Sequence, residues 1–260
     1  MSRDACASPL GMLGWCLFLL SLIALISCSS ITSSAPVSIT PSDRIPTQTS
    51  IPVLTTTPIP TDTGWLTLPS GLEYRELYVT FQNQSDHLRL ARVDPSHFNF
   101  RVLYAPNQPR QVSEWLASNE AFLLVVNGGY FDPAYHALGQ LISDGISVGR
   151  NYQGFGGMFA VNLDGTVQIR WNIQQPYVEG EGLKYALQNF PMMIIPGGGS
   201  NDQIDDNGEL ALRSIVGQDR SGRIIFIVSP SAAFTLSGMS QWLPISDLDL
   251  NVALNLDGGT

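Results

Sequence analysis

The sequence predicts an α+β fold: a β-rich, mixed sheet core with a few short helices in a single globular domain. Short apolar or alternating runs recur from about residue 71 onward, at the length and spacing typical of strands. Most of these runs follow one another directly through turn residues such as Asp164-Gly165, which leaves little room for helices between them. The 260 residues allow one large domain or two small ones, and no internal repeat divides them.

Residues 1–27 have the pattern of a lipoprotein-type signal peptide. Residues 10–27 are uncharged and strongly apolar, and they lead into Cys28 through Leu-Ile-Ser, which resembles a bacterial lipobox. The resemblance implies cleavage before Cys28, lipid attachment to its thiol and anchoring to a bacterial membrane. A permanent signal anchor and plain secretion remain open, because the apolar run approaches the length of a membrane span. All three alternatives place the following domain outside the cytoplasm.

Residues 28–64 are predicted to be a disordered tether. Ser, Thr and Pro dominate this stretch, so it cannot bury enough apolar area to repay the cost of chain ordering. Its prolines favour extended conformations that would hold the domain away from the membrane. The globular domain is therefore predicted over residues 65–260.

The first elements of this domain follow from alternating and amphipathic patterns. Strands are expected at Gly71–Thr80, Asp86–Val93 and Asn99–Tyr104, with a turn at residues 94–96 between the last two. A helix is expected at Pro109–Asn119, because its apolar residues share one face and a proline precedes them.

The stretch that follows joins a strand to a polar turn. Four apolar residues, Leu123–Val126, predict a strand buried on both faces. Asn127-Gly128-Gly129 then permits tight backbone conformations, and two aromatic residues and Asp132 follow. Such a turn often has no further role. A second strand end of the same kind, Val252–Gly259, makes a functional role more attractive, because it also places a polar residue before two glycines.

The remaining elements are predicted from short apolar runs and from helical patterns. Helices are expected at Glu181–Asn189 and Leu236–Leu243. The acidic stretch Asn201–Glu209 is expected to be a solvated loop; calcium binding is the alternative, although the EF-hand spacing is absent. Strands are expected at residues 139–145, 158–165, 167–171, 192–195, 210–217, 223–228 and 253–256.

Charge and composition exclude several classes of function. The formal net charge of −9 argues against nucleic-acid binding, which needs basic patches. Charged residues make up only 13% of the chain, and such an uncharged polar surface suits a protein that handles carbohydrate. All three cysteines precede residue 29 and the three histidines are scattered. Neither a cysteine nucleophile, nor a metal site, nor a cofactor is therefore expected.

Four segments occur in the order and at the separations of a known family. They are Asn127–Asp132, Gly139–Gly145, Arg213–Gly217 and Ala253–Gly259. Over about Gly71–Thr260 the chain resembles the phosphodiester glycosidase family, which includes the lysosomal uncovering enzyme and bacterial members often linked to exopolysaccharide. The resemblance implies a hydrolase that cleaves a sugar-1-phosphodiester in glycan or exopolysaccharide metabolism. Family members continue with another strand, so an end at Thr260 predicts a truncated C-terminus.

The resemblance also implies roles for four side chains. A departing phosphate needs charge neutralisation more than protonation, and the guanidinium of Arg213 can fork onto two phosphate oxygens. Asp257 is the candidate nucleophile or general base. Asp132 is its candidate partner carboxylate or merely a turn cap, and Asn127 would orient a sugar hydroxyl or the phosphate. The alternatives are a structural ion pair for Arg213 and a plain hairpin turn for Asp257.

Backbone amides are the candidate substrate-binding groups. The N–H groups of Gly128, Gly129, Gly258 and Gly259 would donate to phosphate oxygens, as they do in phosphate-binding nests.

A rival function is non-catalytic binding of a glycan or glycan-phosphate in the cell envelope. An exposed Asp257 close to Arg213 would favour the enzyme. A buried ion pair without a cleft would favour the binding protein.

Overall fold

The computed structural model describes residues 61–258. The predicted signal peptide, the lipidation site Cys28, most of the predicted tether and Gly259 lie outside the described residues. No helix in the described part of the chain is long and apolar enough to cross a membrane. The folded region already includes Asp62, whose carboxylate pairs with Arg75 at 2.7 Å.

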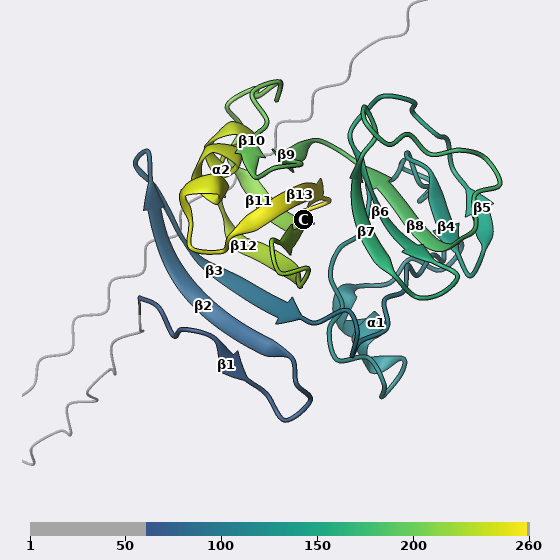
Figure 1. The fold of residues 1–260 in the computed structure, drawn as a ribbon, viewed down its shortest axis with the longest axis horizontal. Helices are drawn as coiled ribbons and strands as arrows, with labels where there is room; N and C mark the ends of the chain where they lie inside the picture. Colours follow the sequence, from purple (N-terminus) through teal and green to yellow (C-terminus); the bar gives the residue numbers. More distant parts are fainter. Residues whose placement is uncertain (1–60, 259–260) are drawn as a thin grey trace, which may run out of the picture. The chain divides into compact units, whose positions relative to one another are not determined.

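Two antiparallel β-sheets form within residues 61–258 (Figure 1). Their strand orders are β1-β2-β3-β12-β11-β13-β9-β10 and β5-β4-β8-β6-β7. Every strand pair is antiparallel, so the predicted mixed sheet and α+β class are corrected to a β-rich fold with a few short helices. The bounds are Leu66–Thr67 (β1), Glu73–Phe81 (β2), Gln84–Val93 (β3), Leu141–Ser143 (β4), Ile146–Val148 (β5), Gly157–Asn162 (β6), Val167–Trp171 (β7), Leu183–Asn189 (β8), Met192–Ile195 (β9), Gly199–Ser200 (β10), Ala211–Asp219 (β11), Ile224–Phe234 (β12) and Leu250–Leu256 (β13).

Strand alternation sends side chains into separate hydrophobic clusters. In β13, Val252 and Leu254 join a cluster to which both sheets contribute, whereas Ala253 joins a second cluster that includes residues of the helix α2 (Leu236–Trp242). The period-2 geometry of a strand explains this division, because successive side chains point to opposite faces of the sheet. The second strand end of the sequence thus belongs to a strand that is buried on both faces, in the middle of the larger sheet.

The helices are short, and α2 begins with a side-chain cap. The helix α2 begins after Thr235, whose Oγ1 accepts a hydrogen bond from Gly238 N at 2.9 Å. Asp206 of the acidic loop accepts from Ser237 N at 2.7 Å, and a carboxylate is also favourable at this positive end of a helix. The short 3-10 helix η1 (Leu243–Ile245) follows directly, and the other helix is α1 (Val112–Ala117), within the predicted span.

Three predicted elements are wrong. Residues 181–189 contain the strand β8 rather than a helix, because β8 is paired between β4 and β6 and six of its seven residues are buried. Asn99–Tyr104 and Leu123–Val126 have no regular secondary structure. Leu123 is 53% exposed and Leu124 is 38% exposed, which contradicts a strand buried on both faces. In residues 61–258 neither segment has a neighbouring strand with which to form a ladder.

Candidate active site

The loop at Asn127-Gly128-Gly129 and the glycine-containing end of β13 meet in the structure. Asp257 directly follows β13, and its backbone N–H donates to the carbonyl oxygen of Gly128 at 2.8 Å. This bond joins two segments that are far apart in the sequence. Asn127 and Asp257 are both partly buried, and both line the same cavity. The structure therefore brings two of the predicted catalytic residues into one neighbourhood.

The pairing of β11 with β13 holds Arg213 beside this strand end. Ser214 of β11 lies opposite Leu256 of β13 in an antiparallel register. Arg213 directly precedes Ser214, so this register holds it next to the end of β13. The close approach continues at Gly258, where an added Cβ would lie 2.0 Å from the carbonyl oxygen of Leu212.

Arg213 is buried and bound to main-chain carbonyl groups. It is 9% exposed; its Nε donates to Phe234 O at 3.1 Å and its Nη2 to Glu209 O at 2.9 Å. These acceptors are uncharged, whereas the buried Arg75 and Arg170 bind carboxylates. Burial lowers the pKa of Arg213, and the nearby Tyr130, Asp206 and Glu209 oppose that shift. A guanidinium that burial destabilises in this way gains from an anionic ligand.

Tyr130 is partly buried and is held by contacts with Asn255 and Phe190. Its hydroxyl accepts a hydrogen bond from Asn255 Nδ2 at 2.8 Å, and its ring centroid lies 4.9 Å from that of Phe190. Burial raises the pKa of Tyr130, and the negative charge of Asp257 raises it further, while Arg213 and the bond from Asn255 act in the opposite direction. Tyr130 therefore lies within electrostatic reach of both Asp257 and Arg213.

Asn255 is a candidate site residue that the sequence analysis missed. It is 1% exposed and precedes Asp257 by two residues on β13. Its Nδ2 donates to Tyr130 and, at 3.2 Å, to Phe190 O, while its Oδ1 has no hydrogen-bond partner among residues 61–258. A buried polar atom without a partner costs about 1–3 kcal/mol, so Oδ1 gains from a hydrogen bond donated by a bound water or ligand. The available signal was an asparagine between two leucines, within a strand whose other residues apart from Asn251 are apolar.

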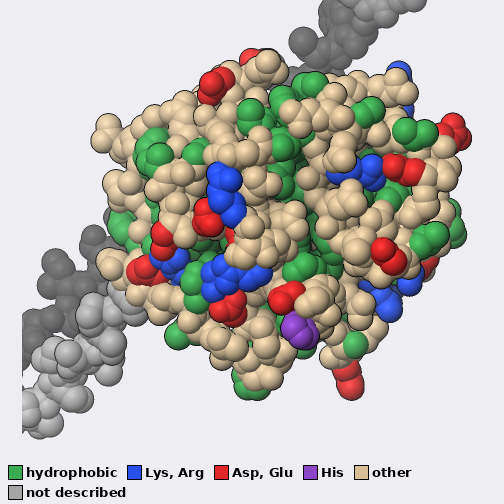
Figure 2. All heavy atoms as spheres, in the orientation of Figure 1, with side chains coloured by type: hydrophobic (Ala, Val, Ile, Leu, Met, Phe, Trp, Pro, Cys, Tyr) green, Lys and Arg blue, Asp and Glu red, His purple; other side chains and the backbone are tan. Residues whose placement is uncertain are grey.

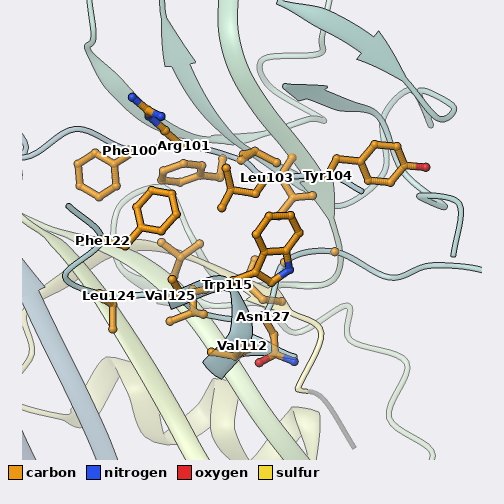
Figure 3. A pocket seen from close by; sticks show the side chains of 18 of the residues that line it. Phe100, Arg101, Leu103, Tyr104, Val112, Trp115, Phe122, Leu124, Val125 and Asn127 are labelled. Carbon is orange, nitrogen blue, oxygen red and sulfur yellow. The ribbon is translucent and has the colours of Figure 1, made fainter. Parts of the chain in front are cut away.

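A cavity of about 740 Å³ adjoins this site. Its lining is mostly apolar and aromatic, and Figure 3 shows Phe100, Trp115 and Phe122 among the side chains that face it. Asn127 lies in the same wall (Figure 3). Small-molecule sites commonly have this size and an apolar lining with a few convergent polar groups.

Asp132 is engaged by its own loop. Its Oδ1 accepts from Ala134 N at 2.8 Å and from His136 N at 2.9 Å, and its Oδ2 lies 3.2 Å from His136 Nδ1. The backbone bond from His136 is the main reason why the pKa of Asp132 is lowered. These contacts are those of the turn cap, which was the alternative to a partner carboxylate.

The glycines of the site have packing roles. An added Cβ on Gly129 would lie 2.9 Å from Leu187 Cδ1, so a side chain at this position would press on β8. Gly258 is closed to a side chain by Leu212, as described above. Donation from the amides of Gly128, Gly129 and Gly258 to a phosphate stays a prediction.

On the face that Figure 2 presents, charged groups of both signs are dispersed among uncharged ones. Within residues 61–258 no three His, Cys, Asp or Glu side chains gather in a way that could hold a metal ion. A metal-independent reaction therefore remains an expectation to be tested.

Comparison with known proteins places the chain in a family. The profile of the phosphodiester glycosidase family matches residues 121–260. The catalytic domain of zebrafish N-acetylglucosamine-1-phosphodiester alpha-N-acetylglucosaminidase, auto-inhibited by its pro-peptide, is similar in fold, with a TM-score of 0.51, 22% identity and coverage of 77% of this chain and 72% of that chain. A hypothetical protein from Synechocystis has a TM-score of 0.45 and 14% identity, with 72% and 56% covered. Curated protein sequences gave no match. Because the profile spans more than half of its length and includes both glycine turns, the chain belongs to the phosphodiester glycosidase family.

Proposed function

We propose that this protein hydrolyses a sugar-1-phosphodiester at the anomeric carbon of the sugar. The observation that carries the proposal is that Asp257 and Tyr130 line one ligand-sized cavity, while the buried Arg213 lies on β11 beside the end of β13. A carboxylate and a guanidinium are the two charged groups that this reaction needs. Membership of the family supports the same reaction type.

The proposed chemistry divides between the two charged side chains. The bond from the anomeric carbon to the phosphate oxygen breaks, and the phosphate departs with the electron pair through an oxocarbenium-like state. Arg213 neutralises the charge that grows on the departing phosphate. Asp257 either attacks the anomeric carbon, forming a glycosyl ester that water later hydrolyses, or takes a proton from the attacking water. The phosphate needs little protonation, so the engagement of Asp132 in its own loop does not prevent the reaction.

The protein is further proposed to act outside the cytoplasm, held on a bacterial membrane by lipid at Cys28. The lipobox-like sequence before Cys28 and the Ser/Thr/Pro-rich composition of residues 28–64 support this placement. A substrate derived from cell-envelope glycan or exopolysaccharide is consistent with that location.

The test is release of free sugar from a panel of methyl phosphodiesters of sugar 1-phosphates. Asp257→Asn keeps the shape of the side chain and removes the base or nucleophile, so we expect turnover to fall by about 10³-fold or more while binding persists. The matched control is Asp249→Asn, because Asp249 is an exposed carboxylate at the other end of β13 that pairs with Arg220. The control should retain wild-type turnover. Binding without turnover in the wild type would instead favour the non-catalytic glycan-binding alternative.

A further inference from the structure

The hydroxyl of Tyr130 has a hydrogen atom that its bond to Asn255 does not use. Asn255 Nδ2 lies 3.2 Å from the carbonyl oxygen of Phe190 and 2.8 Å from the hydroxyl of Tyr130. A carbonyl oxygen only accepts hydrogen bonds, so the nitrogen of the amide, rather than its oxygen, must face Phe190. The same nitrogen therefore donates to Tyr130, whose hydroxyl acts as the acceptor. The hydroxyl can still donate its own hydrogen elsewhere.

The surroundings of Tyr130 keep this hydroxyl protonated and fixed in place. Burial and the charge of Asp257 both raise its pKa, so the phenol is neutral at ordinary pH and cannot serve as an anionic nucleophile. Its ring packs against Phe190, and Asn255 is almost completely buried. A donor held in this way needs no reorganisation when charge develops nearby, which is the condition for strong transition-state stabilisation.

Tyr130 and Asp257 line the same cavity. We propose that Tyr130 is a further catalytic residue, whose hydroxyl donates a hydrogen bond to an oxygen of the departing phosphate in that cavity. This inference rests on the proposed function, and it divides the stabilisation of the phosphate between a cation and a neutral donor. No proton is transferred: the phosphate leaves as an anion, and the tyrosine keeps its proton. Asn255 acts as a positioning residue, because its amide fixes the direction of the hydroxyl.

The deciding experiment compares Tyr130→Phe with Tyr78→Phe in steady-state hydrolysis of the best sugar-1-phosphodiester of the panel. Phenylalanine keeps the ring against Phe190 and removes only the hydroxyl. Tyr78 is the control, because it lies on β2, is 42% exposed and does not line the cavity. We expect kcat of Tyr130→Phe to fall about 10²-fold with KM within threefold, as for loss of one preorganised donor. Tyr78→Phe should behave as wild type, and both variants should keep the wild-type melting temperature within a few degrees.

Four outcomes overturn the proposal or one of its parts. A kcat of Tyr130→Phe within threefold of wild type removes the hydroxyl from catalysis, and a rise in KM at unchanged kcat assigns it to substrate binding alone. If Asn255→Asp or Asn255→Ala leaves kcat unchanged, the positioning role of Asn255 is wrong. A wild-type protein that hydrolyses no phosphodiester of the panel refutes the proposed function, and with it the catalytic role proposed for Tyr130. Activity in the wild type together with an unimpaired Tyr130→Phe refutes only the role of the tyrosine.

Discussion

Gly258→Ala is predicted to inactivate the site through the backbone alone. The added Cβ would lie 2.0 Å from Leu212 O and 2.5 Å from Leu212 C, whereas real Cβ contacts essentially never fall below 3.0 Å. The main chain must therefore shift by about 1 Å to remove the clash, because the carbonyl carbon and oxygen of Leu212 cannot rotate away as a side chain could. The shift moves Asp257, the preceding residue, relative to Arg213. A misplacement of about 1 Å typically lowers turnover by about 10²-fold.

The assay for this prediction is steady-state hydrolysis of the same phosphodiester, with thermal unfolding measured in parallel. Gly199→Ala is the control, because its added Cβ would meet only Ile195 Cγ1 at 3.8 Å, an ordinary contact. We expect kcat/KM to fall about 10²-fold for Gly258→Ala and to stay within twofold for Gly199→Ala. Wild-type activity in Gly258→Ala would show that the alignment of Asp257 with Arg213 does not limit the reaction.

Four further predictions concern Arg213, Glu73, the predicted lipidation of Cys28 and the expected independence of the reaction from metal. Arg213→Lys keeps the positive charge but loses the two parallel N–H donors of the guanidinium. Turnover should therefore fall by about 10²–10³-fold, and by a larger factor than substrate affinity does. Equal losses of turnover and affinity would contradict a role in the transition state. Glu73 has its pKa lowered mainly by its bond from Arg92, so it stabilises the fold above its ordinary pKa of 4.5 and loses that contribution as the pH falls through the lowered value. In Glu73→Gln the melting temperature should therefore fall less steeply than in the wild type as the pH drops below 4.5. The same pH dependence in both proteins would show that the ionisation of Glu73 does not contribute to stability. Cys28→Ala should release the protein from the membrane fraction or block its processing, and wild-type fractionation would exclude lipidation. Dialysis against a strong chelator should leave turnover intact; a loss that zinc or manganese restores would displace Arg213 as the main neutraliser of the phosphate.

The sequence predicts those strands whose local pattern and tertiary surroundings agree. The alternating stretch at 71–80 and the Asp164-Gly165 hairpin appear as β2 and as the turn between β6 and β7. The segment 181–189 misleads because its Ala, Leu, Lys and Gln favour helices in isolation. Pairing on both edges and burial of Tyr185, Ala186 and Leu187 override that preference. Propensity is a weak prior wherever a sheet supplies a partner on each side.

The candidate site is only partly readable from the sequence. The glycine turns and Arg213 stand out because their residue types are unusual for strand ends and for a buried strand. Tyr130 and Asn255 do not stand out, since each is a plausible core or turn residue in its own segment. Their relation depends on β13 lying next to β9, which brings Phe190 and the loop at residue 130 together, and no local pattern encodes that neighbourhood.

The place of β13 in the larger sheet has a consequence for biosynthesis. It is the last described strand in the chain, yet it lies between β11 and β9, which are made earlier. Synthesis from the N-terminus therefore completes β13 after both of its neighbours, and it must insert between two strands that already exist. Such late, non-local pairing slows folding and exposes edges that invite association. The candidate site draws Asp257 and Asn255 from β13 and its end, so it is incomplete until β13 has paired with β11 and β9.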